Sequence, residues 1–230
     1  MGGPWRRSRC PAGSRTASTA AGSATDVSET GSTRLVLVRH GQIAANTARI
    51  WHGSTDSPLT DHGRLEAQRT GEHLARTRPA VRALYTSPLQ RTRDTAAEIG
   101  ARLGLEPIVE PGLAEYGIGE LEGVSYQALL DEHGFFTRIR DDLDFAPPGG
   151  ESPNAVMARV TAALQRISIA HRGFEVVVVS HGAALGIALG QLLDRDPMRW
   201  QQYHLSNCGL SELVLEPAPR LIAWNRTDHL

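Results

Sequence analysis

The stretch Leu35-Val36-Leu37-Val38-Arg39-His40-Gly41 has a later counterpart in Val176-Val177-Val178-Val179-Ser180-His181-Gly182. Both begin as short apolar runs without polar alternation, which is typical of strands buried on both faces of a parallel sheet covered by helices. In open parallel sheets, ligands bind beyond the carboxyl ends of the strands. We therefore expect His40 and His181 to face a shared site, with a sharp turn at the glycine after each.

Helix patterns alternate with strand patterns from residue 35 onward. Thr60 can cap a helix whose inner face includes Leu65, Leu74 and Ala75, and Ser152-Pro153 is typical of the start of another helix. Two strand-like runs follow near the end of the chain. This order predicts an α/β fold, a three-layer α/β/α sandwich with a mostly parallel central sheet.

The sequence divides into a tail and one domain. Residues 1–32 contain few large apolar side chains, so we expect a disordered N-terminal tail. Residues 33–230 are enough for one domain with a full core. Residues 111–151 interrupt the alternation with a Gly-rich, acidic and aromatic segment. We expect this segment to be a small insertion of helices and loops over the strand ends, where it would influence the choice of substrate.

Composition excludes several classes of function. The net charge of -1 favours neither nucleic acid nor an anionic membrane as a partner. No apolar run approaches the roughly 18 to 20 residues that span a bilayer. Two cysteines are too few for a disulfide framework, which favours a reducing, cytoplasmic location. All 24 basic residues are arginines, so lysine Schiff-base chemistry and a Walker lysine are excluded.

Polar residues close to the two histidines favour a phosphoryl site. Arg39 directly precedes His40, Asn46 lies just beyond it, and Arg91 follows Ser87-Pro88 near the expected start of a helix. Taken singly, they have ordinary interpretations as a solvated loop residue, a helix cap and a helix-surface charge. Together, arginine forks, an amide and a helix N-terminus are the donors that hold phosphoryl oxygens.

Five motifs then occur in order along the chain. They are Leu35 to Gly41 with Asn46, His52-Gly53 and Asp56 to Thr60; Ser87-Pro88-Leu89 with Arg91 and Thr95; Leu113-Ala114-Glu115 with Gly119 and Glu122-Gly123; Gly150-Glu151-Ser152; and Ser180-His181-Gly182. This series resembles the histidine phosphatase superfamily, which includes phosphoglycerate mutases. The resemblance covers essentially everything after the tail, and is closest to the broad-specificity phosphatase branch.

The resemblance implies a role for each matching residue. His40 would be the nucleophile that forms a phosphohistidine. The phosphoryl oxygens would be bound by Arg39, Arg91, Asn46 and His181. His52, Gly53 and Gly182 are further candidate substrate contacts. A neutral imidazole must attack, so we expect the other nitrogen of His40 to donate to a backbone carbonyl. His181 should carry positive charge when the phosphate dianion is bound.

Glu115 is the expected general acid. It would protonate the departing alkoxide and then, as a carboxylate, deprotonate the water that hydrolyses the phosphohistidine. Glu110, Glu120 and Glu122 lie nearby and compete for this role. The motif position selects Glu115.

The predicted function is a phosphomonoesterase that acts on small soluble phosphate esters without a metal ion or another cofactor. The chain contains no His-x-His and no His-Glu-x-x-His motif, which disfavours metal-assisted hydrolysis. A phosphoglycerate mutase-type phosphotransferase, an α-ribazole phosphatase and a non-catalytic phosphate-binding module remain as alternatives. An apolar edge strand near the end of the chain is a candidate interface for a homodimer.

Overall fold

The computed structural model describes residues 31–230, so the predicted tail lies almost entirely outside the described residues. Ser32 is nevertheless 6% exposed. The neighbouring Thr33 hydroxyl donates to the Ser168 carbonyl oxygen at 2.6 Å. The packed body therefore already includes Ser32, one residue earlier than the sequence predicts.

A six-stranded sheet forms the centre of the molecule, in the order β3-β2-β4-β1-β5-β6. The strands are β1 (Arg34–Arg39), β2 (Val81–Thr86), β3 (Pro107–Val109), β4 (Glu175–Ser180), β5 (Leu210–Val214) and β6 (Arg220–Arg226). The first four pair in parallel, whereas β5 is antiparallel to both β1 and β6. The mostly parallel α/β prediction is confirmed.

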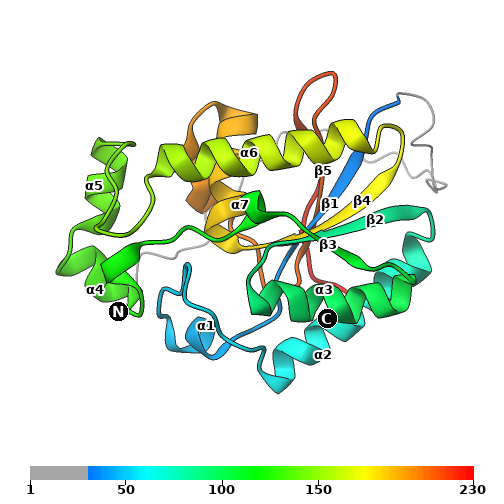
Figure 1. Cartoon of the computed structure of the whole chain (residues 1–230), viewed down its shortest axis with the longest axis horizontal. Coiled ribbons are helices and arrows are strands. Elements are labelled where there is room, and N and C mark those ends of the chain that lie inside the picture. The colour runs from blue at the N-terminus through cyan, green and yellow to red at the C-terminus, as the bar shows by residue number, and fades with distance from the viewer. Residues whose placement is uncertain (1–30) are drawn as a thin grey trace, which may run out of the picture.

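Helices cover both faces of the sheet, as Figure 1 shows. Successive strand residues point to opposite faces, so Leu35 and Leu37 of β1 pack in one core and Val36 and Val38 in the other. The first core lies beneath α6 (Pro153–Ala170) and α7 (Gly182–Leu189). The second lies against α2 (Asp61–Thr77) and α3 (Gln90–Leu103). The three predicted layers are therefore present.

Local capping explains where the covering helices begin. The Thr60 side chain accepts from the Gly63 N–H at the start of α2, and Ser152 accepts from Ala155 at the start of α6. Leu74 is buried on the inner face of α2 as predicted, but the prediction for Leu65 is wrong, because Leu65 is 50% exposed. The buried face of this helix also carries polar residues such as Glu66, whose carboxylate accepts from the Gln42 N–H at 2.8 Å.

The expected insertion lies beside the strand ends (Figure 1). Its elements are η2 (Pro111–Leu113), η3 (Gly119–Leu121), α4 (Tyr126–Asp131) and α5 (Phe135–Asp141). Trp51, buried in the segment after β1, ties the insertion down by bonds to the carbonyls of Val124 and Tyr116 at 3.0 and 3.1 Å. Its ring also meets Phe135 edge-on. The remaining elements are α1 (Ala44–Ala48), η4 (Gly190–Asp194) and η5 (Pro197–Tyr203).

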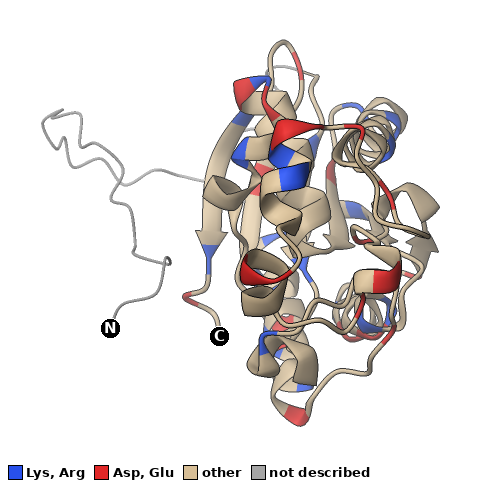
Figure 2. Cartoon of the chain, turned by 90° about the vertical axis from the view of Figure 1, so that its left-hand side faces the viewer, with Lys and Arg blue, Asp and Glu red and all other residues tan. Residues whose placement is uncertain are grey.

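Charge is distributed without a dominant sign over the described part of the chain. In the view of Figure 2, acidic and basic positions are interspersed along the helices and loops. Between residues 31 and 230, no helix is both long enough and apolar enough to cross a membrane.

Candidate active site

Parallel register brings the ends of three strands to one place. In the sheet, β4 lies between β1 and β2, and Arg39 pairs with Ser180 while Thr86 pairs with Val179. The residue directly after each strand is polar: His40 follows β1, His181 follows β4, and Ser87 follows β2. The two imidazole rings lie 5.3 Å apart between centroids, and both side chains are buried. The shared site expected from the paired strand motifs is therefore present.

The ring of His40 is held through one nitrogen, Nδ1, and no hydrogen bond within residues 31–230 engages its Nε2. Its Nδ1 lies 2.8 Å from the Gly41 carbonyl oxygen, which can only accept, so Nδ1 carries the proton. This is the backbone contact that we expect from the sequence. Burial, followed by the charges of Arg39 and Arg91, lowers the pKa of His40 well below its ordinary value. The ring is consequently neutral, and the lone pair is on Nε2.

The turn after His40 depends on close backbone packing. A Cβ at Gly41 would lie 2.4 Å from the carbonyl oxygen of Gly63, at the start of α2. The Gly41 N–H donates to Thr95 Oγ1 at 3.0 Å. A glycine at position 41 thus lets α2 and α3 fix the backbone that carries the imidazole.

His181 is also neutral, with the opposite tautomer. Arg91 Nε donates to its Nδ1 at 3.2 Å, so the ring proton lies on Nε2, which is 2.7 Å from Ser87 Oγ. Burial, then Arg91, His40 and Arg39, lower the pKa of His181 well below its ordinary value. The positive charge expected with a bound dianion concerns another state and stays a prediction.

Arg91 is a buried brace, and its interpretation as a helix-surface charge is wrong. Its side chain is 0% exposed. Besides the bond to His181, its terminal nitrogens donate to the carbonyl oxygens of His52, Gly53 and Thr55, at 3.2, 2.7 and 2.8 Å respectively. Arg91 therefore shapes the loop over the site and brings a positive charge beside both histidines.

Arg39 presents an unused donor. Its terminal NH1 donates to the Leu205 carbonyl oxygen at 2.8 Å, but its Nε is buried and has no hydrogen-bond partner among residues 31–230. A Cβ at Gly182 would lie 3.4 Å from this Nε. Buried donors are rarely left unpaired in native proteins. This atom is therefore suited to an anionic oxygen, and Gly182 helps to leave room beside it.

Asn46 caps the start of α1 and also binds Asn207, which contacts His40. Its Oδ1 accepts from the Ile43 N–H at 3.0 Å and from Asn207 Nδ2 at 3.1 Å. Asn207 Nδ2 also donates to the His40 carbonyl oxygen at 2.9 Å. The amide oxygen of Asn46 is thus engaged, which leaves its Nδ2 as the group able to donate to a ligand.

His52 and Gly53 mainly make contacts that hold the loop 52–57 in place. His52 Nδ1 lies 2.8 Å from Ser57 Oγ, and the Gly53 N–H donates to Glu122 at 2.8 Å. Glu122 also accepts from the N–H groups of Ser54, Thr55 and Ile118. Burial raises the pKa of Glu122, but these hydrogen bonds outweigh it and lower the pKa overall. Glu122 is therefore a loop anchor, held as a carboxylate.

The carboxylate of Glu115 lies at the N-terminus of α7. Its Oε1 accepts from the N–H groups of Tyr116 and Ala184, at 2.8 and 2.7 Å, and its Oε2 accepts from Ala183 at 3.2 Å. A helix N-terminus stabilises a carboxylate. Of the competing acids, Glu110 caps η2 and pairs with Arg166, whereas Glu120 is exposed. Glu115 is the carboxylate held where α7 begins, directly after His181.

Sequence reasoning missed two residues of the site as individual candidates. The motif that contains Ser87 does not indicate a role for it, yet its hydroxyl is the hydrogen-bond partner of His181 Nε2. Asn207 precedes β5 and carried no signal, because its partners lie 161 and 167 residues away in the chain.

The two buried histidines of the site should contribute to the pH dependence of stability. Their pKa values are lowered in the folded state, so the unfolded chain binds more protons below the ordinary histidine pKa. The stabilisation is present above that value and is lost as the pH falls. We expect these two histidines together to lower the free energy of unfolding by about 2 to 3 kcal/mol between pH 7.5 and pH 5.5, measured by urea titration as the difference between the wild type and the His40→Asn/His181→Asn double variant. The pKa values of His73, His204 and His229 are also lowered, so part of the dependence should remain in the double variant. Parallel curves for the two proteins would contradict the neutral assignment.

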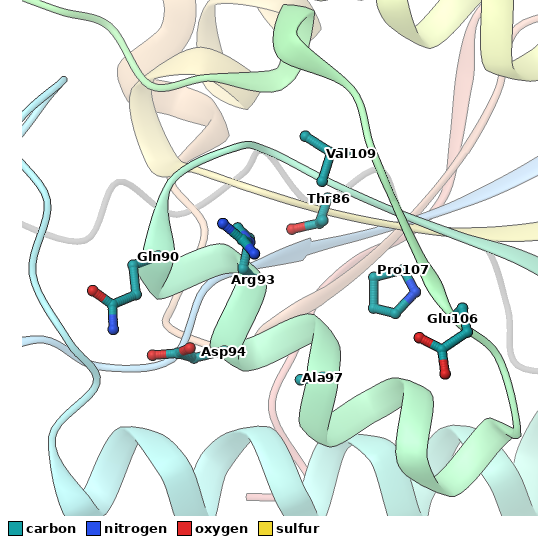
Figure 3. A pocket seen from close by; sticks show the side chains of 8 residues that line it. All are labelled: Thr86, Gln90, Arg93, Asp94, Ala97, Glu106, Pro107 and Val109. Atoms are coloured by element: carbon teal, nitrogen blue, oxygen red, sulfur yellow. The ribbon is translucent and has the colours of Figure 1, made fainter.

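A separate hollow lies between α3 and β3, with a volume of about 480 Å³ (Figure 3). None of the predicted site residues lines it, and its lining carries both charge signs, from Arg93, Asp94 and Glu106. Neither in this hollow nor anywhere else in the described part of the chain is a group of three His, Cys, Asp or Glu residues arranged to hold a metal ion.

Comparison with known proteins shows which family this chain resembles. The family model for the histidine phosphatase superfamily (branch 1) matches residues 35–227. Phosphoglycerate mutase-like protein 4 of Arabidopsis thaliana is 37% identical over 156 residues, which cover 66% of this chain and 67% of that protein. Bifunctional protein Rv2228c of Mycobacterium tuberculosis is 32% identical over 201 residues, or 86% of this chain. The chain spans only 55% of that relative's length.

A solved structure agrees with the sequence relatives. The mycobacterial glucosyl-3-phosphoglycerate phosphatase Rv2419c, in complex with VO3, superimposes with a TM-score of 0.72 at 29% identity. The match covers 84% of this chain and 99% of that chain.

Proposed function

The chain belongs to the histidine phosphatase superfamily, and we propose that it is a phosphomonoesterase that hydrolyses small soluble phosphate esters through a phosphohistidine on His40. The observation that carries this proposal is the state of His40, a neutral buried imidazole with Nδ1 held by a carbonyl and Nε2 free. Such a ring is ready for in-line attack on phosphorus without prior loss of a proton.

Four groups would hold the phosphoryl oxygens. Arg39 supplies the unpaired buried Nε, Asn46 its Nδ2, and Arg91 a positive charge whose donors are mostly committed to the loop. His181 would take up a proton, or share one with the dianion, as negative charge arrives. Phosphoryl transfer depends mainly on positioning and charge neutralisation, and these arginines supply both without a metal ion.

Glu115 would act as the acid through one particular oxygen. A carboxylate offers about four lone-pair positions, and three are taken by backbone N–H groups, two on Oε1 and one on Oε2. The remaining position is on Oε2. A proton carried there would pass to the leaving oxygen, and the carboxylate would afterwards accept a proton from the attacking water.

Glu115→Gln tests this assignment. We expect kcat/KM to fall about 100- to 1000-fold for an alkyl phosphate, whose leaving oxygen needs the proton, and less than about 10-fold for p-nitrophenyl phosphate. Glu120→Gln, at an exposed neighbouring carboxylate, should behave like the wild type with both substrates. Equal losses of kcat/KM for the two substrates would contradict the acid role.

The main competing activity is phosphoryl transfer to a second substrate, as the name of the Arabidopsis relative suggests for that protein. The test is p-nitrophenyl phosphate hydrolysis with EDTA present, together with a phosphoglycerate interconversion assay. A phosphatase releases phosphate faster than it interconverts phosphoglycerates, and EDTA leaves its rate unchanged. Faster interconversion would support a mutase, and phosphate binding without turnover would support a non-catalytic module.

The same proposal covers location and assembly. We place the protein in the cytoplasm, which agrees with a chain of two cysteines, of which Cys208 is buried and forms no disulfide within residues 31–230. A homodimer through β6 is supported by the position of that strand at the sheet edge and by Ile222, which is 46% exposed.

A further inference from the structure

Arg159, on α6, uses every N–H group of its guanidinium to bind one short backbone segment and one carboxylate. Its NH1 donates to the carbonyl oxygens of Gly112 and Ala114, at 3.1 and 2.6 Å, and its NH2 to that of Glu115 at 2.8 Å. Nε and NH2 also bind the two oxygens of Glu151, at 2.7 and 2.8 Å. An arginine has five N–H donors, and all five are used here.

The bonds reach both sides of Glu115. Those to Gly112 and Ala114 hold the chain before it, and the bond to its own carbonyl oxygen holds the residue itself. Glu151 continues the contact beyond, because its Oε2 accepts from the Gly117 N–H at 3.3 Å and its own N–H donates to the Gly117 carbonyl oxygen at 2.8 Å. The segment 112–117 is thus held by Arg159 on α6 and by Glu151 just before that helix.

Ion pairing alone does not explain this arrangement. The side chains of Arg159 and Glu151 are 22% and 33% exposed, and a pair so accessible to solvent contributes little to stability. The three carbonyl bonds need the planar fork of an arginine, which a lysine ammonium cannot reproduce. The arrangement is therefore specific for the backbone that carries Glu115.

We propose that Arg159, oriented by Glu151, is a positioning residue that fixes the Glu115 carboxylate at the N-terminus of α7. This inference rests on the proposed acid role of Glu115. The carboxylate meets the N–H groups of Ala183 and Ala184 only while its backbone stays in place. Displacements of about 1 Å in a catalytic group can cost about 100-fold in rate. Arg159 touches no reacting atom and acts through the acid.

The test compares leaving groups in Arg159→Lys. We expect kcat/KM to fall about 10- to 100-fold for an alkyl phosphate and less than about 3-fold for p-nitrophenyl phosphate. Arg166→Lys is the matched control, since Arg166 lies on the same helix and pairs with Glu110 while 59% exposed. Its two kcat/KM values should equal those of the wild type. Glu151→Gln, which keeps the side-chain size, should show a smaller loss with the same selectivity.

A double variant separates positioning from general destabilisation. In the Glu115→Gln background, Arg159→Lys should add no further selective loss, because the group it positions is gone. Suppose that Glu115→Gln is selective and that Arg159→Lys unfolds at the wild-type temperature. If Arg159→Lys then lowers kcat/KM equally for both substrates, or for neither, this inference alone is overturned. An unselective Glu115→Gln would overturn the acid role and this inference together.

Discussion

Replacing His40 with asparagine is expected to lower kcat/KM for p-nitrophenyl phosphate by about 10,000-fold or more, the size of effect seen when a covalent nucleophile is removed. Asparagine keeps an amide N–H that can still donate to the Gly41 carbonyl oxygen, but it has no counterpart of Nε2. The variant should therefore fold and bind inorganic phosphate. Turnover should be lost because no atom remains to attack phosphorus.

The matched control is His62→Asn. His62 lies on α2, is 62% exposed, and has its Nε2 3.4 Å from the Glu66 carboxylate. Its kcat/KM should remain within about 2-fold of the wild-type value, as for most surface substitutions. If His40→Asn kept more than a tenth of the wild-type kcat/KM, His40 could not be the nucleophile.

Arg91→Lys is expected to damage both activity and stability. Lysine keeps the charge but cannot reach His181 and three carbonyl oxygens at once, so buried acceptors lose their partners. We expect the free energy of unfolding to fall by about 3 kcal/mol in urea titrations. The kcat/KM for p-nitrophenyl phosphate should fall about 1000-fold, because the loop 52–55 and the His181 ring lose their alignment.

Arg93→Lys serves as the control for this substitution. Arg93 is two residues away on α3, exposed, and lines the hollow of Figure 3. Both its kcat/KM and its free energy of unfolding should match the wild type. Wild-type stability in Arg91→Lys would contradict the bracing role, and wild-type kcat/KM would contradict its part in the site.

The fold was predictable where hydrophobic pattern and capping agree. The two apolar runs gave β1 and β4, and Ser152-Pro153 gave the start of α6. The face of α2 was not predictable in the same way. There Glu66 is buried because it bonds the Gln42 N–H, while Leu65 faces solvent. Hydrophobic periodicity cannot detect a buried carboxylate whose partner is a backbone amide.

The motifs indicated which residues lie together, but not which contacts they make. They selected His40, His181 and Arg91, and the ends of β1 and β4 and the start of α3 bring these three side chains together. They could not indicate that Arg91 braces a loop, nor that Asn207 joins His40 to Asn46. Such contacts depend on carbonyl groups and side chains from distant parts of the chain, and side-chain sequence alone does not reveal where a carbonyl points.

The central claim is a phosphoryl group carried by His40. The most direct measurement mixes the enzyme with excess p-nitrophenyl phosphate and EDTA, quenches in alkali, where phosphohistidine survives, and locates the modification by peptide mass spectrometry. The account predicts one phosphoryl group on the His40 peptide, lost after acid treatment and absent in His40→Asn. Phosphate release at the full rate with His40 unmodified, or a phosphoryl group on another residue, would contradict it.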